Sequence, residues 1–276
     1  MPAQRIAENL AYINWTVLVG LGVGSFAAVL LARLRTDATR GYLAFTAACA
    51  VGFGLLAYLS DTGLPAAVAG SAVTADPAWD GPRRLALAAF TILAAAYTVA
   101  LARRGRAPIL GSVALLAGCV VLGFGAIGWS AGATKAVPLV IQFGTLALAT
   151  GGVFASMILG HWYLVTPKLP EAPLVLFSRI LLWVVTFQLL LFAVWVTTGT
   201  GGNGPFSALS GPWALFVWLR LIVGITFPLI VSWAAVQTAR SRSMESATGL
   251  LYINVGSIAA GTILAAGLYF GAGMLV

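Results

Sequence analysis

The chain of 276 residues is 61% hydrophobic and 8% charged, whereas soluble globular domains carry about a quarter of charged residues. Its mean hydropathy of +1.00 excludes a soluble protein. The net charge is +8, but the basic residues stand between long apolar runs and not on one polar face, so nucleic acid is not an expected partner. One His and two Cys exclude a zinc site, a multi-haem cytochrome and a disulfide framework.

Eight apolar stretches are long enough to cross a bilayer, which takes roughly 20 residues. They lie at 12–32, 42–60, 85–102, 108–129, 137–161, 174–197, 213–236 and 247–272. A bilayer offers no hydrogen-bonding partners to the backbone, and no stretch alternates with the period of a barrel strand. We therefore predict an all-α polytopic membrane protein of eight transmembrane helices, with the lipid bilayer as its surroundings.

The positions of Lys and Arg predict the orientation, because these residues are retained on the cytoplasmic side. The segments after the first, third, fifth and seventh spans hold Arg33, Arg35, Arg40, Arg103, Arg104, Arg106, Lys168, Arg240 and Arg242. The opposite side holds Arg5, Arg83, Arg84 and Lys135, and its longest loop carries Asp61, Asp76 and Asp80. We expect a bacterial-type inner membrane, both termini outside the cytoplasm, and an outer aromatic belt of Trp79, Trp129 and Trp213.

An internal repeat relates residues 1–132 to residues 133–276. With a shift of 136, Arg84 meets Arg220 and two further arginine pairs fall in register. With a shift of 128, the stretch beginning at Gly24 meets the one beginning at Gly152. We predict a parallel duplication of a four-helix unit, the two halves having the same orientation. Shared composition and the positive-inside rule are the alternative explanation of these matches.

Arg220 is the most informative single residue, because it stands inside the seventh span, where a cation costs roughly 2.5–3.5 kcal/mol. With Arg84, its equivalent in the repeat, it is a candidate for holding a carboxylate, a haem propionate, a quinone oxygen or a lipid phosphate. The alternative is an arginine that snorkels toward the membrane surface.

His161 and Arg179 form a second candidate site at the inner end of the fifth and sixth spans, together with Lys168 and Glu171. A single His can ligate one haem iron or donate to a quinone carbonyl. Two-histidine haem ligation within the chain is excluded because only one His is present. The alternatives are an interfacial aromatic belt for His161 and positive-inside anchoring for Arg179.

Among the amides within spans, Gln142 and Gln188 are the candidate ligand contacts, although hydrogen bonds between helices are the usual role of such residues. Pro228 in the seventh span is expected to kink the helix or free a carbonyl. Small residues four apart, such as Gly20 with Gly24, predict close helix packing.

These features favour a membrane subunit or anchor of a larger electron-transfer complex, which binds a lipophilic cofactor, either a quinone or one haem. The partners expected are other membrane subunits or further copies of the chain, and a non-catalytic subunit is favoured over a stand-alone enzyme. A transporter or channel for a small neutral or weakly anionic solute is the second class. An enzyme acting on lipids or isoprenoids, or an assembly factor, is the third. Hydrolytic catalysis is not expected, since no Ser, His and Asp set or metal-ligand spacing is present.

Overall fold

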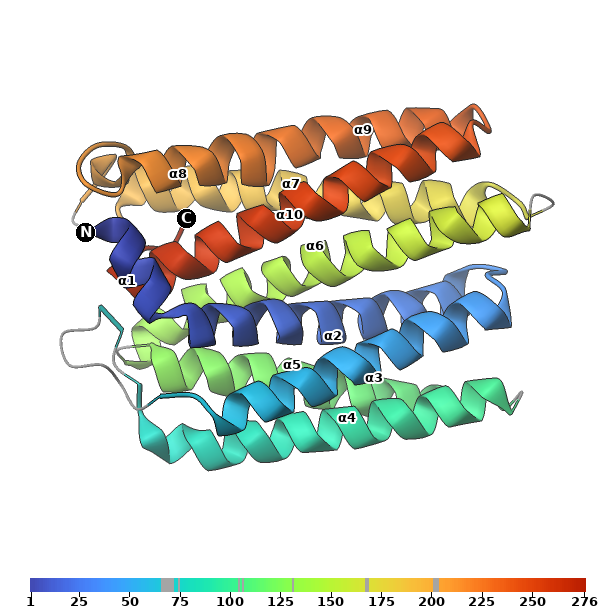
Figure 1. Ribbon diagram of the computed structural model, residues 1–276, viewed down its shortest axis with the longest axis horizontal. Coiled ribbons are helices and arrows are strands. Elements are labelled where there is room, and N and C mark those ends of the chain that lie inside the picture. The colour runs from blue at the N-terminus through green and yellow to red at the C-terminus, as the bar shows by residue number, and fades with distance from the viewer. Residues whose placement is uncertain are drawn as a thin grey trace.

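The computed structural model describes residues 1–65, 72–73, 75–103, 105, 107–130, 132–166, 169–200 and 204–276, and leaves the side chains of 133 and 134 undescribed. In these ranges the chain is helical and contains no strand. The helices run along the long axis of the molecule, and both chain termini lie at one end, here called the terminal end (Figure 1). The opposite end is called the basic end, because the described Arg33, Arg35, Arg40, Arg103, Arg240 and Arg242 lie in or beside its turns.

Eight helical segments of the described chain are long and apolar enough to span a membrane, as predicted. The long helices are α2 (Leu10–Arg35), α3 (Arg40–Thr62), α4 (Asp80–Ala102), α5 (Pro108–Trp129), α6 (Ala133–Val165), α7 (Ala172–Thr198) and α10 (Met244–Ala272), and one span combines α8 (Ala214–Leu221), η3 (Ile222–Thr226) and α9 (Phe227–Arg240). The short elements are α1 (Pro2–Glu8), η1 (Pro77–Trp79) and η2 (Ser207–Leu209).

Local sequence signals set where several helices begin and end. Pro108 starts α5, where its missing N–H costs no helical hydrogen bond. The side chain of Thr39 caps α3 by accepting a hydrogen bond from the Tyr42 N–H. Gly199 and Gly273 follow α7 and α10 in the left-handed conformation, at φ of 70° and 68°. Glycine adopts this conformation without the steric cost that a Cβ atom brings.

The helices form two closed rings of four. In the first ring α2 packs on α3, α3 on α4, α4 on α5 and α5 on α2. In the second ring α6 packs on α7, α7 on α9, α9 on α10 and α10 on α6. The predicted halves thus correspond to separate rings. The duplication itself stays a prediction, because ring membership concerns contacts and not the superposition of one half on the other.

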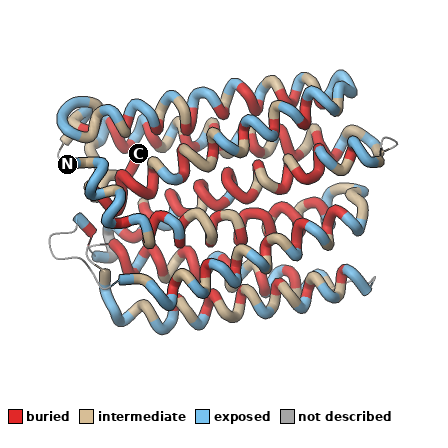
Figure 2. Tube along the Cα trace, viewed as in Figure 1, coloured by how far each residue is buried: buried red, intermediate tan, exposed pale blue. Residues whose placement is uncertain are grey.

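The two rings meet mainly along α2 and α6, where the backbones approach closely. A Cβ atom added to Gly151 would lie 2.1 Å from the backbone nitrogen of Ser25 and 2.3 Å from the carbonyl carbon of Gly24. Only glycine allows this approach, so the small-residue pattern around Gly24 is explained by the contact with α6. Buried residues accordingly concentrate where the rings meet, and exposed residues on the outer helices (Figure 2).

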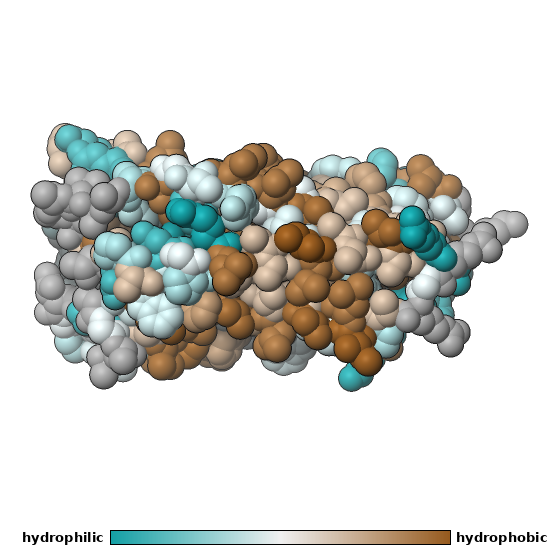
Figure 3. Space-filling model, turned by 90° about the horizontal axis from the view of Figure 1, so that it is seen from below, coloured by the Kyte–Doolittle hydropathy of each residue, from teal (hydrophilic) through white to brown (hydrophobic). Residues whose placement is uncertain are grey.

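The outward faces of the bundle are apolar. On α4, Leu85, Ile92 and Val99 recur every seven residues and are 73%, 69% and 48% exposed. On α7, Trp183 and Leu190 are exposed in the same way. The face turned downward in Figure 1 is mostly hydrophobic along its length, with hydrophilic side chains gathered toward its ends (Figure 3). Such a surface is stable against lipid tails and not against water.

Candidate functional site

The first ring holds a buried ion cluster at the terminal end. Asp61, in the last turn of α3, is fully buried and accepts hydrogen bonds from Trp15 Nε1 at 2.8 Å and from Arg83 Nε at 2.7 Å. Arg84 Nε donates to the same carboxylate at 3.2 Å. Arg83 Nη1 also lies 2.9 Å from Asp80 Oδ1. Two arginines and two aspartates balance in charge, so this cluster is compensated from within the chain.

Two expectations about this region are wrong. Asp61 belongs to α3 and not to the following loop. Its carboxylate forms an ion pair with Arg83 inside the ring. Trp129 is 1% exposed and packs between Trp15, at a ring-centroid distance of 4.6 Å, and Phe143 of the second ring. The guanidinium carbon of Arg83 stands 4.7 Å from the centre of the Trp129 ring. Trp129 is therefore part of the core and not of an aromatic belt.

The second ring holds a cation of a different kind. Arg220, in the last turn of α8, is 3% exposed. Its Nη2 donates to Oε1 of Gln188 on α7 at 3.2 Å, and its Nη1 donates to the Gly224 carbonyl at 3.0 Å. Within the described part of the chain no carboxylate pairs with Arg220. The charge is thus held by neutral acceptors alone, and Nε has no hydrogen-bond partner.

Pro228 follows the segment whose carbonyl Arg220 uses. In an α-helix the N–H of residue 228 would donate to the carbonyl of residue 224, but proline has no N–H. In π-helical pairing the missing N–H concerns the carbonyl of residue 223 instead. The carbonyl that accepts from Arg220 Nη1 is that of Gly224. The five residues before Phe227 form the π-helical segment η3, a rare geometry often found at functional sites. That Pro228 frees a particular carbonyl stays a prediction.

A glutamine of the second ring connects Arg220 to α6. Gln188 Nε2 donates to the carbonyl of Thr145 at 3.0 Å, so Gln188 links α6 to Arg220. One turn before Thr145, Gln142 is 2% exposed, and neither its Nε2 nor its Oε1 has a partner. Buried polar groups without partners are rare, since each costs about 1–3 kcal/mol. Gln188 and Arg220 are here called the polar cluster. No described contact joins the side chain of Gln142 to either residue.

An apolar groove of about 240 Å³ lies beside the polar cluster, between α2, α6 and α7. Its walls are Gly24, Ala27, Ala28 and Leu31 from α2, Leu148, Gly152 and Ser156 from α6, and Phe177, Ile180, Leu181 and Val184 from α7. Apart from Ser156, whose hydroxyl donates to the carbonyl of Gly152 within α6, these side chains carry no hydrogen-bonding group. The groove is therefore suited to a hydrocarbon chain.

The groove and the polar cluster occupy consecutive turns of the same helix faces. Gln188 follows the groove residue Val184 by four positions, a rise of about 6 Å along α7. Thr145 precedes the groove residue Leu148 by three positions on α6. Residues three and four apart share a helix face. A molecule with an apolar tail in the groove would accordingly bring a polar head to Gln188.

The remaining predicted site residues lie elsewhere. Arg84, with 39% of its side chain exposed, is bound to Asp61 in the first ring and makes no described contact with Arg220. His161 is exposed, and its Nδ1 lies 3.4 Å from the hydroxyl of Tyr252 on α10. Arg179 is exposed on α7, and no described contact joins it to His161. Lys168, Arg104 and Arg106 lie outside the described residues. No group of three His, Cys, Asp or Glu residues that could hold a metal ion occurs within the described ranges.

Glu171, expected in one candidate site with His161 and Arg179, forms an ion pair with Arg242 at the basic end. Arg242, between α9 and α10, donates from Nη2 and Nε to Glu171 Oε2 at 2.6 and 2.8 Å. This hydrogen bonding lowers the pKa of the Glu171 carboxyl below its ordinary value. The pair ties the turn before α7 to the turn before α10, on the surface of the molecule.

No family model, curated protein or solved structure matches this chain.

The sequence analysis did not predict that Asp61, Arg83 and Trp15 form one hydrogen-bonded cluster. The signal available was a pair of arginines directly after Pro82, at the start of a span, and an aspartate at the end of the preceding span. Cation and anion at the same depth of neighbouring helices are expected to pair.

Proposed function

We propose that the protein is a membrane subunit of an electron-transfer complex and binds a lipophilic cofactor of the quinone class beside α6 and α7. The observation that carries the proposal is the succession of an apolar groove and a polar cluster along the same faces of these helices. A quinone combines an isoprenoid tail with carbonyl oxygens that only accept hydrogen bonds. The tail matches the groove, and the carbonyls match donors of the Arg220 guanidinium and of the glutamine amides.

A haem, the other cofactor expected from the sequence, has weaker support than a quinone. His161 is the only His in the chain, and it lies exposed beside Tyr252. It does not line any of the three described cavities. A quinone site needs no metal ligand. The polar residues that it would use are buried in the second ring.

The setting proposed is a bacterial-type inner membrane, with the terminal end outside the cytoplasm and the basic end inside. The partners proposed are other membrane subunits or further copies of the chain, bound through helix faces within the bilayer. Exposed aromatic and aliphatic side chains on α7, such as Trp183 and Leu190, offer such a face.

The test is purification of the tagged protein from its native membrane in a mild detergent, followed by extraction and mass spectrometry of quinones and co-purifying subunits. We expect about one quinone for each chain in the wild type. Arg220→Leu is expected to reduce the quinone content at least ten-fold, because it removes the head-group donor while leaving the apolar groove intact. Arg240→Leu, at the exposed end of the same span, is the matched control and should keep it.

A further variant separates loss of binding from loss of folding. Gly152→Trp fills the groove, and a Cβ at Gly152 meets no atom within 4 Å, so the first carbon of the new side chain is tolerated. We expect it to lose quinone while eluting as the wild type does in size-exclusion chromatography. A wild-type protein with neither quinone nor redox subunits would overturn the proposal.

Transport of a small neutral or weakly anionic solute is the second candidate function. It is favoured by the unpartnered amide of Gln142 and the unpartnered Nε of Arg220 in the second ring, which a small solute can satisfy. Uptake of a monocarboxylate such as acetate into proteoliposomes, lost in Arg220→Leu and kept in Arg240→Leu, would support transport over cofactor binding.

A further inference from the structure

A separate cavity of about 300 Å³ lies at the basic end, between α2, α4 and α5 of the first ring. It is lined by Leu30, Arg33, Leu34, Tyr97, Leu101, Ala107, Pro108 and Ser112. The cavity is at the membrane surface, because Arg33 is two residues from the end of α2 and Pro108 is the first residue of α5. None of these residues belongs to the polar cluster or to the groove beside it.

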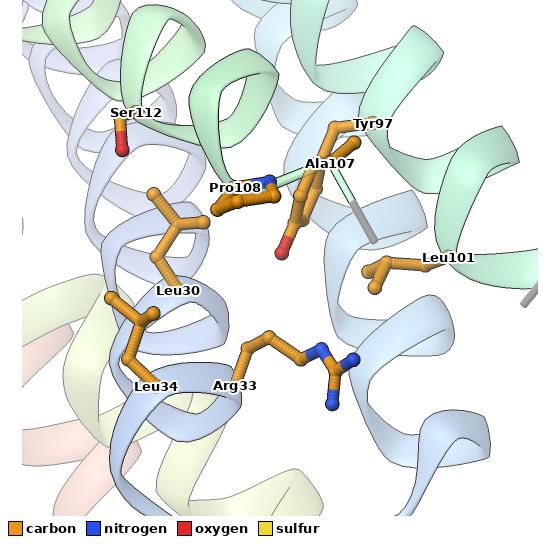
Figure 4. Close-up of a pocket in the computed structure, with 8 residues that line it drawn as sticks. All are labelled: Leu30, Arg33, Leu34, Tyr97, Leu101, Ala107, Pro108 and Ser112. Atoms are coloured by element: carbon orange, nitrogen blue, oxygen red, sulfur yellow. The ribbon is translucent and has the colours of Figure 1, made fainter. Parts of the chain in front are cut away.

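Two polar groups project into this cavity from different helices. Figure 4 shows the hydroxyl of Tyr97, from α4, pointing into the cavity and the side chain of Arg33, from α2, extending along its edge. No carboxylate of the described chain forms an ion pair with Arg33. A cation and a hydroxyl donor that line the same cavity provide a site for an anionic oxygen.

The rest of the wall is apolar. Five of the eight lining residues are aliphatic or proline, and Leu34 is 67% exposed on the outer surface of α2. The cavity therefore continues onto the surface where acyl chains lie. A free phosphate would leave this apolar wall uncovered, whereas a phospholipid covers it with glycerol and the first methylene groups of its chains.

The charge around the cavity has the same sign as Arg33. Arg35, Arg40 and Arg103 are exposed at this end, and Asp37 is the acidic residue in the turn between α2 and α3. Clustered Lys and Arg residues beside a membrane attract anionic lipid. The local field thus favours an anionic head group over a zwitterionic one.

We propose that this cavity binds the phosphate group of an anionic phospholipid. Arg33 pairs with the phosphate, Tyr97 donates a hydrogen bond to it, and Leu30 and Leu34 contact the upper part of an acyl chain.

The experiment uses native mass spectrometry of the purified, delipidated protein titrated with phosphatidylglycerol or phosphatidylcholine. We expect the wild type to bind phosphatidylglycerol about ten-fold more tightly than phosphatidylcholine. Arg33→Gln should abolish the preference, and Tyr97→Phe should reduce it a few-fold. Arg35→Gln removes the same charge from the same helix end outside the cavity, and should keep most of it.

Two further arms identify the site and the source of the phosphate. Ser112→Trp fills the cavity without changing the charge and should abolish the preference. Glycerol 3-phosphate, which has the head-group chemistry without acyl chains, should not compete with phosphatidylglycerol. Equal loss in Arg33→Gln and Arg35→Gln, an unchanged preference in Ser112→Trp, or competition by glycerol 3-phosphate would each overturn the lipid site.

Discussion

Asp61 is the residue on which the terminal end of the first ring depends. Its carboxylate accepts hydrogen bonds from Trp15, Arg83 and Arg84, and both Asp61 and Arg83 are at most 1% exposed. Removing one partner of a buried ion pair leaves the other charge without compensation, which costs about 3–5 kcal/mol. We therefore expect Asp61→Asn to lower the free energy of unfolding by about 3 kcal/mol, because Asp80 still neutralises part of the Arg83 charge.

Unfolding in mixed detergent micelles, followed by the loss of helical circular dichroism, measures this effect. Asp37→Asn is the control, since Asp37 is exposed and lies in the turn between α2 and α3. The double variant Asp61→Leu with Arg83→Leu should recover much of the stability lost in Asp61→Leu. Equal stability of Asp61→Asn and Asp37→Asn would contradict a structural role for the cluster.

Single residues were predictable where the apolar run around them was unbroken. Arg220 interrupts a long hydrophobic stretch, so its place inside a span followed from the sequence. The sequence left burial and snorkelling toward the membrane surface as alternatives, and the structure shows Arg220 only 3% exposed. Asp61 follows Ser60 at the end of an apolar stretch, so the sequence pattern indicated a loop residue. Its partner Arg83 stands 22 positions later, and only the packing of α3 on α4 brings the two together.

At the scale of helices, the contact of α2 with α6 depends on two glycines. A Cβ atom on Gly151 would lie 2.1 Å from backbone of α2, and one on Gly24 would overlap the carbonyl of Ala147. Backbone atoms cannot move aside as a flexible side chain can. We therefore expect Gly151→Ala to destabilise the protein by about 3 kcal/mol in the same unfolding experiment.

Gly144 on the same helix provides the matched control. A Cβ atom there meets no other atom within 4 Å, so Gly144→Ala should leave stability unchanged or slightly raised, as alanine favours helix. If Gly151→Ala is as stable as Gly144→Ala, the two helices do not cross at this point.

The sequence predicted that small residues would mark close packing, but not against what. Gly24 meets a helix backbone, whereas Gly271 is confined by the ring of Trp213, 2.9 Å from where its Cβ would lie. Gly152 meets nothing within 4 Å, although another small residue, Ser156, stands four positions after it. The spacing of small residues is a property of one helix and can be read from the sequence. The group that each glycine contacts depends on how the two rings pack together.

At the scale of the whole molecule, the two rings bury arginines in opposite ways. In the first ring Arg83 and Arg84 are balanced by aspartates, while in the second ring Arg220 has only neutral acceptors. The predicted repeat would place Arg84 and Arg220 in register. The two positions have different surroundings, a compensated cluster in one half and neutral acceptors in the other. Counting spans could not reveal this difference, because it depends on which residue of a neighbouring helix faces each arginine.

The orientation of the bundle in the membrane decides what each site can meet, and it is testable with single cysteines. In a chain with Cys49→Ala and Cys119→Ala, Ser210→Cys places a thiol at the terminal end and Ser241→Cys one at the basic end, both on exposed residues. Because Lys and Arg are retained in the cytoplasm, we expect a membrane-impermeant maleimide to label only Ser210→Cys in intact cells. Opening the membrane should make both react, which controls for intrinsic reactivity.

Labelling of Ser241→Cys alone in intact cells would show that the basic end faces outward, which is the opposite of the orientation expected from the positive-inside rule. The expected result has a structural consequence for both proposed sites. Arg220 lies about 9 Å along its helix from the start of α8 at the terminal end. The polar cluster would then lie in the outer half of the membrane, while the Arg33 cavity would open at the cytoplasmic surface. Anionic lipids enriched in the cytoplasmic leaflet would reach that cavity, and a cofactor head group would meet its redox partner on the outer side.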